Sequence, residues 1–239
     1  MHNTSRILLP LDTDTADKAL ALAAKLQGEV AGFKVGLELI NSAGFDVFDK
    51  LSNLDNPNIF YDCKYHDIPN TVAGAARAAG RRGLWMFNIH ASGGSAMLKA
   101  AVAGAEEGAS AAGHKKPLVI AVTVLTSIDQ PTLTEIGVIG RTVEAQVIAL
   151  AKLAQDAGCD GVVASAHEIE AIRKACGPDF KLVIPGIRPA GSDIGDQKRV
   201  MTPAEAVAAG ADYLVIGRPI TGAADPVAVA SQINVETIA

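Results

Sequence analysis

The sequence predicts a single (β/α)8 barrel domain over residues 1–239, and three observations support this fold class. Strand-like apolar runs alternate with helical segments along the chain, which is typical of a parallel sheet. Eight such runs are present, whereas an open doubly wound sheet usually has about five or six strands. Residues 11–15, after the first run, contain no glycine, so the glycine-rich turn that often follows the first strand of an open sheet is missing.

The predicted strands are short apolar runs, and the segments between them have helical features. These segments are rich in alanine, and their apolar residues recur with amphipathic spacing, as at Val143 and Val147. Thr202 and Glu205 have the spacing of a capping box, and Gly210 should end the helix that they begin. The strands are expected at residues 6–11, 31–37, 58–64, 84–90, 118–125, 161–164, 181–184 and 213–216.

The composition allows one sizeable hydrophobic core. Of the 239 residues, 49% are hydrophobic and 20% are charged, and the mean hydropathy is +0.24. One domain is favoured, because α/β barrels commonly reach this size as a unit. The net charge of −5 and the pI near 5.5 provide no global attraction to nucleic acid or to an anionic membrane, so neither is expected as a partner.

Cysteine and histidine residues give no indication of a metal site. Cys63, Cys159 and Cys176 are odd in number and show no C-x-x-C spacing, which favours reduced thiols in a cytoplasmic protein. The five histidines are scattered without the spacing of zinc ligands, so no metal is expected. No apolar run approaches the roughly 18 residues that would span a bilayer, and residues 1–6 do not resemble a signal peptide. A soluble, cytoplasmic protein is therefore expected.

Charged residues interrupt the third predicted strand and mark it as a candidate site. Side-chain alternation would place Asp62 and Lys64 on one face, about 6.6 Å apart along the strand. Asp67 follows at an expected helix start, where aspartate is a good N-cap and Pro69 is tolerated in the first turn. An ordinary ion pair beside a helix cap is the alternative, so the interpretation depends on the other strand ends.

Two further charged residues are expected near this strand, because functional groups of barrels come from the C-terminal ends of the strands. The first strand ends at Asp12, and the second contains Lys34 between apolar residues that would face the helices. A buried lysine is costly without a carboxylate partner, which Asp12 or Asp62 could provide. Alternatively, Lys34 could extend to solvent and Asp12 could cap the next helix.

The fourth and fifth strands end in less specific residues. Asn88 and His90 lie at the end of the fourth strand, and His90 is interpreted as structural because no acidic residue lies beside it in sequence. Thr126 follows the fifth strand, where a threonine alone carries little information.

The loops after the seventh and eighth strands predict a phosphate site, because barrels commonly bind phosphate there through backbone N–H groups. Arg188 follows the seventh strand, and Gly217 and Arg218 follow the eighth. Gly217 would let the backbone approach the ligand, and either arginine could bind a phosphate through two hydrogen bonds. A plain turn is the alternative for residues 217–219.

The polar segment at about residues 188–202 is predicted to be a lid. It contains glycines and charged residues and follows the seventh strand, beside the predicted phosphate site. A loop of this length is usually either disordered or a lid, and its position favours a lid. Gln197 is the residue expected to reach the ligand.

Residues 62–71 closely resemble the signature of the orotidine 5'-phosphate decarboxylase family, in its bacterial branch. The resemblance extends over nearly the whole chain, through residues 11–12, 32–36, 88–91, 122–127, 185–189, 195–199 and 217–219. Cys63 stands where leucine is usual, and Pro10 lies in a strand that is normally free of proline. Neither departure changes a catalytic position.

The resemblance implies an enzyme that converts orotidine 5'-monophosphate to uridine 5'-monophosphate and CO2, the last step of de novo pyrimidine synthesis, without a metal or an organic cofactor. It implies that Lys64 stabilises the developing C6 carbanion and then protonates it. Asp62 would lie near the substrate carboxylate, where it either repels that group or positions Lys64. Lys34 would complete the charge array. The implied enzyme is a homodimer in which Asp67 and Thr71 reach the partner's site.

The resemblance also implies a set of substrate contacts. Asp12 is expected to hold a ribose hydroxyl and Thr126 the pyrimidine edge, and Ile68 is expected among the substrate-binding residues. The phosphate is expected to contact Arg188, Gln197, Gly217 and Arg218.

Three other functions are compatible with parts of the sequence. Keto-gulonate phosphate decarboxylases and hexulose phosphate synthases also use Asp-x-Lys on strand three, but they need a divalent metal for an enediolate. A class I aldolase would form a Schiff base on a barrel lysine, which Asp62 disfavours because it should keep Lys64 charged. A non-catalytic nucleotide-binding barrel would not need the complete set Lys34, Asp62, Lys64 and Asp67.

Overall fold

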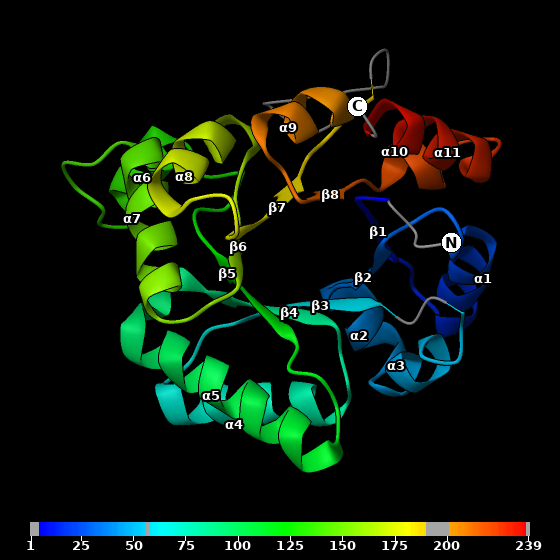
Figure 1. The fold of residues 1–239 in the computed structure, drawn as a ribbon, viewed down its shortest axis with the longest axis horizontal. Coiled ribbons are helices and arrows are strands. Elements are labelled where there is room, and N and C mark those ends of the chain that lie inside the picture. Colours follow the sequence, from blue (N-terminus) through cyan, green and yellow to red (C-terminus); the bar gives the residue numbers. More distant parts are fainter. Residues whose placement is uncertain (1–4, 56–57, 190–200, 238–239) are drawn as a thin grey trace.

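The computed structural model describes residues 5–55, 58–189 and 201–237, and it confirms the predicted closed barrel (Figure 1). The strands are parallel and pair in sequence order, and β8 closes the barrel by pairing with β1. In Figure 1 the strands form a central ring with the helices outside it. The strands are β1 (Ile7–Pro10), β2 (Gly32–Val35), β3 (Ile59–Tyr65), β4 (Met86–His90), β5 (Leu118–Val122), β6 (Gly161–Val163), β7 (Lys181–Pro185) and β8 (Tyr213–Val215).

Helices follow the strands as the alternating sequence pattern predicts. None of the helices in the described part of the chain is long and apolar enough to cross a membrane. Short 3-10 helices are found at Ala91–Gly93 and Ala166–Glu168. The α-helices are α1 (Ala16–Leu26), α2 (Leu37–Ala43), α3 (Asp46–Leu51), α4 (Pro69–Arg81), α5 (Gly94–Ala112), α6 (Gln130–Glu135), α7 (Val143–Asp156), α8 (Ile169–Cys176), α9 (Pro203–Ala209), α10 (Arg218–Thr221) and α11 (Pro226–Thr237).

Local sequence signals predict where the elements lie and, for α9, where the helix begins and ends. Each predicted strand overlaps an observed one, but the run predicted at 118–125 ends as a strand at Val122, and the residues after it form a loop. The capping box before α9 is present, with Thr202 and Glu205 side chains each bonded to the other residue's backbone N–H. Gly210 ends α9 in a left-handed conformation, as predicted.

Apolar side chains form two separate layers, one inside the barrel and one outside it. The inner cluster contains Leu8, Phe60, Met86, Ile120 and Val183, contributed by five strands. The alternate residues of the same strands pack outward against the helices in a larger cluster. Side chains alternate along a strand, so the next inward-facing position lies two residues further on. In β2, β3 and β4 these next inward-facing positions hold polar residues.

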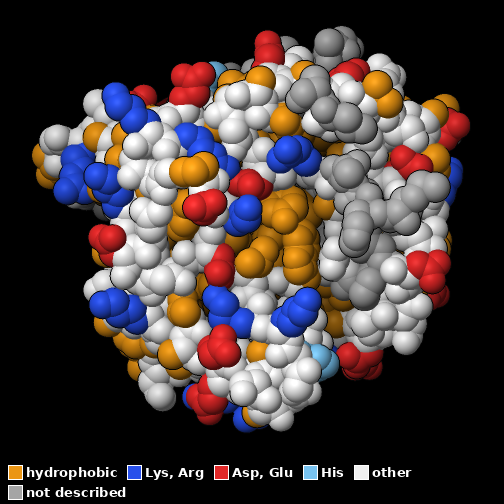
Figure 2. Space-filling model, viewed as in Figure 1, with side chains coloured by type: hydrophobic (Ala, Val, Ile, Leu, Met, Phe, Trp, Pro, Cys, Tyr) orange, Lys and Arg blue, Asp and Glu red, His pale blue; other side chains and the backbone are white. Residues whose placement is uncertain are grey.

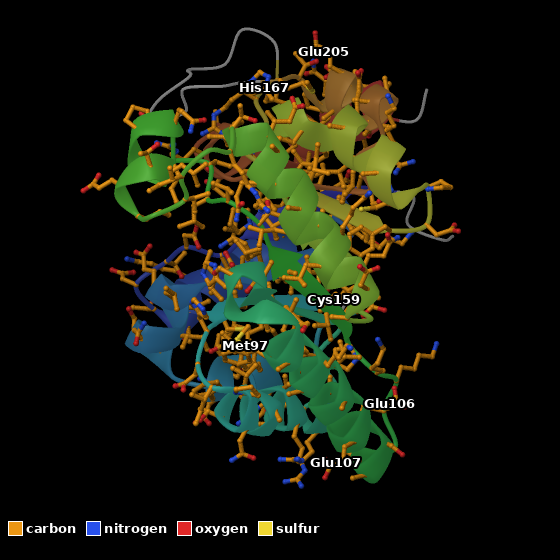
Figure 3. The ribbon with its side chains drawn as sticks, turned by 90° about the vertical axis from the view of Figure 1, so that its left-hand side faces the viewer. Met97, Glu106, Glu107, Cys159, His167 and Glu205 are labelled. Atoms are coloured by element: carbon orange, nitrogen blue, oxygen red, sulfur yellow. The ribbon has the colours of Figure 1, made fainter. Side chains whose placement is uncertain are left out.

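Helices α4 and α5 pack closely beside each other (Figure 1). A Cβ added at Gly104 or Gly108 would lie 2.4 Å or 2.0 Å from backbone oxygens of α4, so only glycine permits this approach. Met97 of α5 is fully buried, whereas Glu107 lies at the surface and binds Arg77 of α4 at 2.8 Å (Figure 3). The N-terminus of α4 is therefore attached to a firmly packed helix pair.

Carboxylates hold the N-terminal ends of several strands. Asp160, before β6, accepts hydrogen bonds from the Val119 N–H and from Lys116 at 2.8–3.0 Å. Asp212, before β8, accepts a hydrogen bond from the Leu182 N–H and is paired with Lys181.

Figure 2 shows one face of the molecule, on which hydrophobic side chains gather at the centre with basic and acidic side chains around them.

Candidate active site

Four charged side chains of alternating sign form a chain across the ends of β1, β2 and β3. Lys34 Nζ lies 3.1 Å from Asp12 Oδ1 and 3.5 Å from Asp62 Oδ2, and Lys64 Nζ lies 2.6 Å from Asp62 Oδ1. The sequence predicted that a buried Lys34 would need Asp12 or Asp62 as a partner, and the structure provides both. The Lys34 side chain does not extend to solvent. Asp12 does not cap the next helix either, because Thr15 is the N-cap of α1.

Burial and neighbouring cations act in opposite directions on Asp62. Its side chain is 15% exposed, and desolvation alone would raise the pKa of its carboxyl group. The charges of Lys34 and Lys64 and hydrogen bonds from Lys64 and Asn88 outweigh this effect and hold the pKa below its ordinary value. Asp62 is therefore an anion at neutral pH, and it binds both lysine ammonium groups.

An irregularity in β3 precedes the start of α4. The pairing of β3 with β4 shifts register between Tyr61 and Tyr65, and Lys64 has a left-handed backbone with φ of +49°. Asp67 does not cap α4, contrary to prediction, because Pro69 occupies the first turn and Ile68 becomes the N-cap residue. Asp67 Oδ1 instead accepts a hydrogen bond from the Ile68 N–H at 2.6 Å.

A cavity of about 200 Å³ lies beside the charge chain. Lys34, Asp62 and Lys64 line it, together with Asn88 and the predicted Thr126. The rest of the wall is mainly apolar and was not predicted from the sequence. It consists of Phe60, Val122, Val124, Leu125, Val163, Ala164, Val183, Pro185 and Val215. Charges that face an apolar cavity act in a low dielectric, where their interactions with a ligand are strong.

Two partly buried groups beside the charge chain are held neutral. Burial raises the pKa of the Cys63 thiol to about 12, and its Sγ donates to the Asn88 carbonyl. His90 is half-buried, and its ring lies 5.4 Å from that of His66. Burial, His66 and Lys64 together lower the pKa of His90, so it is neutral at pH 7. The structural role predicted for His90 remains a prediction.

Arg188, Gly217 and Arg218, the predicted phosphate residues that the structure describes, lie after β7 and β8 and do not line this cavity. Arg188 is 8% exposed, and its backbone N–H donates to the Met201 carbonyl at 3.1 Å, which joins the two ends of the predicted lid segment. Arg218 begins α10. Gly217 precedes it, and a Cβ there would lie 2.8 Å from Pro10 Cγ, so packing alone requires glycine. Gln197 and most of the lid segment, residues 190–200, lie outside the described residues.

Three predicted site residues at the start of α4 lie apart from the cavity of their own chain. Asp67, Ile68 and Thr71 are exposed, and none of them lines the cavity. Ile68 is 66% exposed, which is high for an apolar side chain. The structure therefore brings Asp12, Lys34, Asp62, Lys64 and Thr126 together and leaves these three outside.

Asn88 is the polar site residue to which the sequence assigned no role. It is 1% exposed and contacts both Asp62 and Lys64. Alternation along β4 places Met86 and Asn88 on the same inward face, and Asn88 is in register with Ile120 of β5. This inward-facing position could have identified Asn88 from the sequence.

Comparisons with known proteins show the family to which the chain belongs. A family model described as "Orotidine 5'-phosphate decarboxylase / HUMPS family" matches residues 5–233. A Moorella thermoacetica protein named orotidine 5'-phosphate decarboxylase is 54% identical over 237 residues, which cover 99% of this chain and 93% of that protein. One of the same name from Paramagnetospirillum magneticum is 54% identical over 230 residues, covering 96% of this chain and 97% of the relative.

A solved structure is also similar over nearly its whole length. The crystal structure of orotidine 5'-phosphate decarboxylase from Lactobacillus acidophilus has a TM-score of 0.87 and 38% sequence identity, with 98% of this chain and 100% of that chain covered. The sequence relatives and the solved structure both match nearly the whole of this chain. The chain therefore belongs to the orotidine 5'-phosphate decarboxylase / HUMPS family.

Proposed function

We propose that this chain is a carboxy-lyase that converts orotidine 5'-monophosphate to uridine 5'-monophosphate and CO2, the last step of de novo pyrimidine synthesis. The observation that carries the proposal is the Lys64 ammonium group, held 2.6 Å from Asp62 at the wall of a largely apolar cavity. The names of the relatives at 54% identity support the same activity.

In the proposed reaction, Lys64 acts on the carbon that loses CO2. The bond between C6 and the carboxylate breaks, and its electron pair remains on C6, where the pyrimidine ring cannot delocalise it as an ordinary enolate. The ammonium group of Lys64 stabilises this charge and transfers a proton to C6, and the lysine then regains a proton from solvent. Neither a metal nor an organic cofactor takes part in this scheme.

Asp62 has two possible actions in the same scheme. It can repel the substrate carboxylate, or it can position Lys64. Its Oδ1 atom already accepts hydrogen bonds from Lys64 and Asn88 at 2.6 and 2.7 Å, which supports the positioning action. Lys34 compensates the remaining charge from the other side at 3.5 Å.

Binding of the non-reacting parts of the substrate is assigned to the surrounding strand ends. Asp12 holds a ribose hydroxyl and Thr126 the pyrimidine edge. The phosphate is held after β7 and β8, where the lid closes over it and uses binding energy to complete the charge array. Arg188, Gln197, Gly217 and Arg218 make these phosphate contacts.

The functional unit in this proposal is a homodimer. Asp67 and Thr71 are exposed and do not line the cavity of their own chain, which supports a role for them in the partner's site. The exposed apolar side chain of Ile68 lies between them in sequence and would be covered by the partner.

An absorbance assay for the loss of orotidine 5'-monophosphate, run with EDTA, tests the function. We expect turnover that is equal with and without EDTA. Turnover that disappears in EDTA and returns with a divalent cation would contradict the metal-independent scheme. Absence of turnover in both conditions would contradict the proposal.

A trapping experiment tests the aldolase alternative. Borohydride reduces a Schiff base to a stable secondary amine, so an aldolase would gain the mass of its carbonyl substrate less one oxygen atom. We expect no adduct on Lys64, because its side-chain nitrogen is held in an ion pair with Asp62 at 2.6 Å and is not free to attack a carbonyl. Mass spectrometry of the treated protein distinguishes the two results.

A further inference from the structure

Asn88 lies opposite a bulge that contains the two charged residues of β3. Phe60 pairs with Met86 and Tyr61 pairs with Phe87, but the next pair joins Tyr65 to Ile89. Three residues of β3, Asp62, Cys63 and Lys64, are therefore opposite a single residue of β4. An extra segment of this kind loses regular ladder hydrogen bonds, which other groups must replace.

Asn88 provides hydrogen bonds to all three residues of the bulge. Its Nδ2 donates to Asp62 Oδ1 at 2.7 Å, and its Oδ1 accepts from the Lys64 backbone N–H at 2.7 Å. Its backbone carbonyl accepts from Cys63 Sγ at 3.1 Å. The side-chain amide thus joins the Asp62 carboxylate to the Lys64 backbone, and its burial at 1% exposure excludes competing water.

The conformation that Asn88 supports is one that lysine rarely adopts. Lys64 has a φ of +49°, and a left-handed residue with a Cβ persists only where its surroundings stabilise it. The hydrogen bond from the Lys64 N–H to Asn88 provides such stabilisation. The bond to Asp62 fixes the carboxylate oxygen that also binds Lys64 Nζ.

We propose that Asn88 is a positioning residue, which sets the placement of the Lys64 ammonium group through the bulge backbone and through Asp62. The expected effect on turnover rests on the proposed function. The effect of Asn88 on the placement of the Lys64 ammonium group does not depend on that function. Asn88 acts through these two residues, so its loss should lower kcat far more than it lowers the affinity for product.

Asn88→Asp is the most informative variant. The new carboxyl keeps an acceptor for the Lys64 N–H but, when ionised, cannot donate to Asp62 and repels it. We expect kcat at pH 8 to fall by about 10²-fold, the loss typical of a small displacement of a reacting group. The Kd for uridine 5'-monophosphate, measured by calorimetry, should change by less than about threefold.

Lower pH should partly rescue the same variant. Two adjacent carboxyl groups share a proton, so the new group has a raised pKa and, once protonated, donates to Asp62 as the amide does. The ratio of variant to wild-type kcat should therefore rise between pH 8 and pH 5. Asn53→Asp introduces the same charge at an exposed site outside the barrel, and its ratio should stay near one at each pH.

Asn88→Ala removes both side-chain hydrogen bonds without adding charge, and it should lower kcat by a similar factor with no rescue at low pH. A crystal structure of this variant should show the Asp62 carboxylate rotated and Lys64 out of the left-handed region. An unaltered bulge in that structure would overturn the proposal, as would wild-type kcat in the Asn88→Asp variant at pH 8. If the wild-type protein does not consume orotidine 5'-monophosphate, only the proposed function fails, and this structure still decides the role of Asn88.

Discussion

Lys64 Nζ lies 2.6 Å from Asp62 Oδ1, although the two residues belong to a bulge in which the ladder of β3 is interrupted. Both side chains are partly shielded from water, with 32% and 15% of their surfaces exposed. The ion pair therefore forms at a site with restricted motion and reduced screening. A preorganised charge of this kind needs little rearrangement when negative charge develops in a substrate.

Replacing the Lys64 side chain should abolish turnover while leaving product binding measurable. In the proposed mechanism, Lys64→Ala removes the ammonium group that stabilises and protonates the carbanion, whereas the proposed phosphate and ribose contacts come from other strand ends. We expect a loss of at least about 10³-fold in kcat, measured by absorbance, and a measurable Kd for uridine 5'-monophosphate by calorimetry. The surface variant Lys25→Ala is the control, and near-normal turnover in Lys64→Ala would show that its assigned role is wrong.

Mixing two inactive variants should restore activity if the site is shared between subunits. Lys64→Ala and Asp67→Ala proteins each lack one necessary group, but a heterodimer contains one site with both groups intact. Subunit exchange should restore up to roughly a quarter to a half of the wild-type activity, depending on the share of heterodimers. Each variant incubated alone is the control. Confirmed exchange without restored turnover would rule out a site built across the interface.

A methyl group at Gly36 should disturb the Lys34–Asp12 ion pair without unfolding the barrel. A Cβ there would lie 3.0 Å from Lys34 Nζ and 3.3 Å from Asp12 Oδ1, and these side-chain ends can shift. We expect Gly36→Ala to lower kcat by about tenfold and to change the melting temperature little. Gly28→Ala is the matched control, because nothing lies within 4 Å of a Cβ at that position. Equal kinetics in the two variants would contradict a role for this ion pair.

Asp62 should stabilise the protein at neutral pH but not in acid. Its folded-state pKa lies below the ordinary value near 3.8, so its contribution is present above that value and is lost as the pH falls through the folded-state pKa. Asp62→Asn should lower the free energy of unfolding by about 1–3 kcal/mol at pH 7, because Lys64 loses its ion pair with Asp62 and Lys34 loses one of its two carboxylate partners. Urea unfolding should show this difference shrinking toward pH 3.

Asp14→Asn provides the control for this pH dependence. Asp14 also pairs with a lysine, Lys18 at 2.7 Å, but both side chains are 65% exposed. Solvent screens such a pair, so its loss should have little effect on unfolding at either pH. A difference for Asp62→Asn that is constant from pH 7 to pH 3 would show that the effect does not come from its ionisation.

The barrel and its charge chain could be predicted because they depend on local patterns and simple energetic costs. Alternating strand and helix signals define the fold, and a lysine among apolar residues requires a carboxylate, which led to Asp12 and Asp62 as partners of Lys34. The apolar cavity wall was not predicted. Its residues occupy inward-facing positions, but which of them face open space depends on how the strands tilt and close.

Three local features differ from the sequence-based expectation or add to it. The bulge in β3 is a matter of register with β4, so alternation within one strand could not reveal it. Asp67 was expected to cap α4, but Pro69 at the start of the helix makes Ile68 the N-cap residue. Gly217 was interpreted as letting the backbone approach a ligand, with a plain turn as the alternative, and its contact with Pro10 gives a further reason for the absence of a side chain.

The hydrogen bonds of Asn88 also define what would have to be transferred to build such a site in another barrel. Grafting the Asp-Cys-Lys segment of β3 alone would copy the charges but not the register shift that orients them. The smallest portable unit is a pair of neighbouring strands, with the bulge on one and the facing asparagine on the other. Designers who place catalytic lysines on regular strands would have to supply that support by other means.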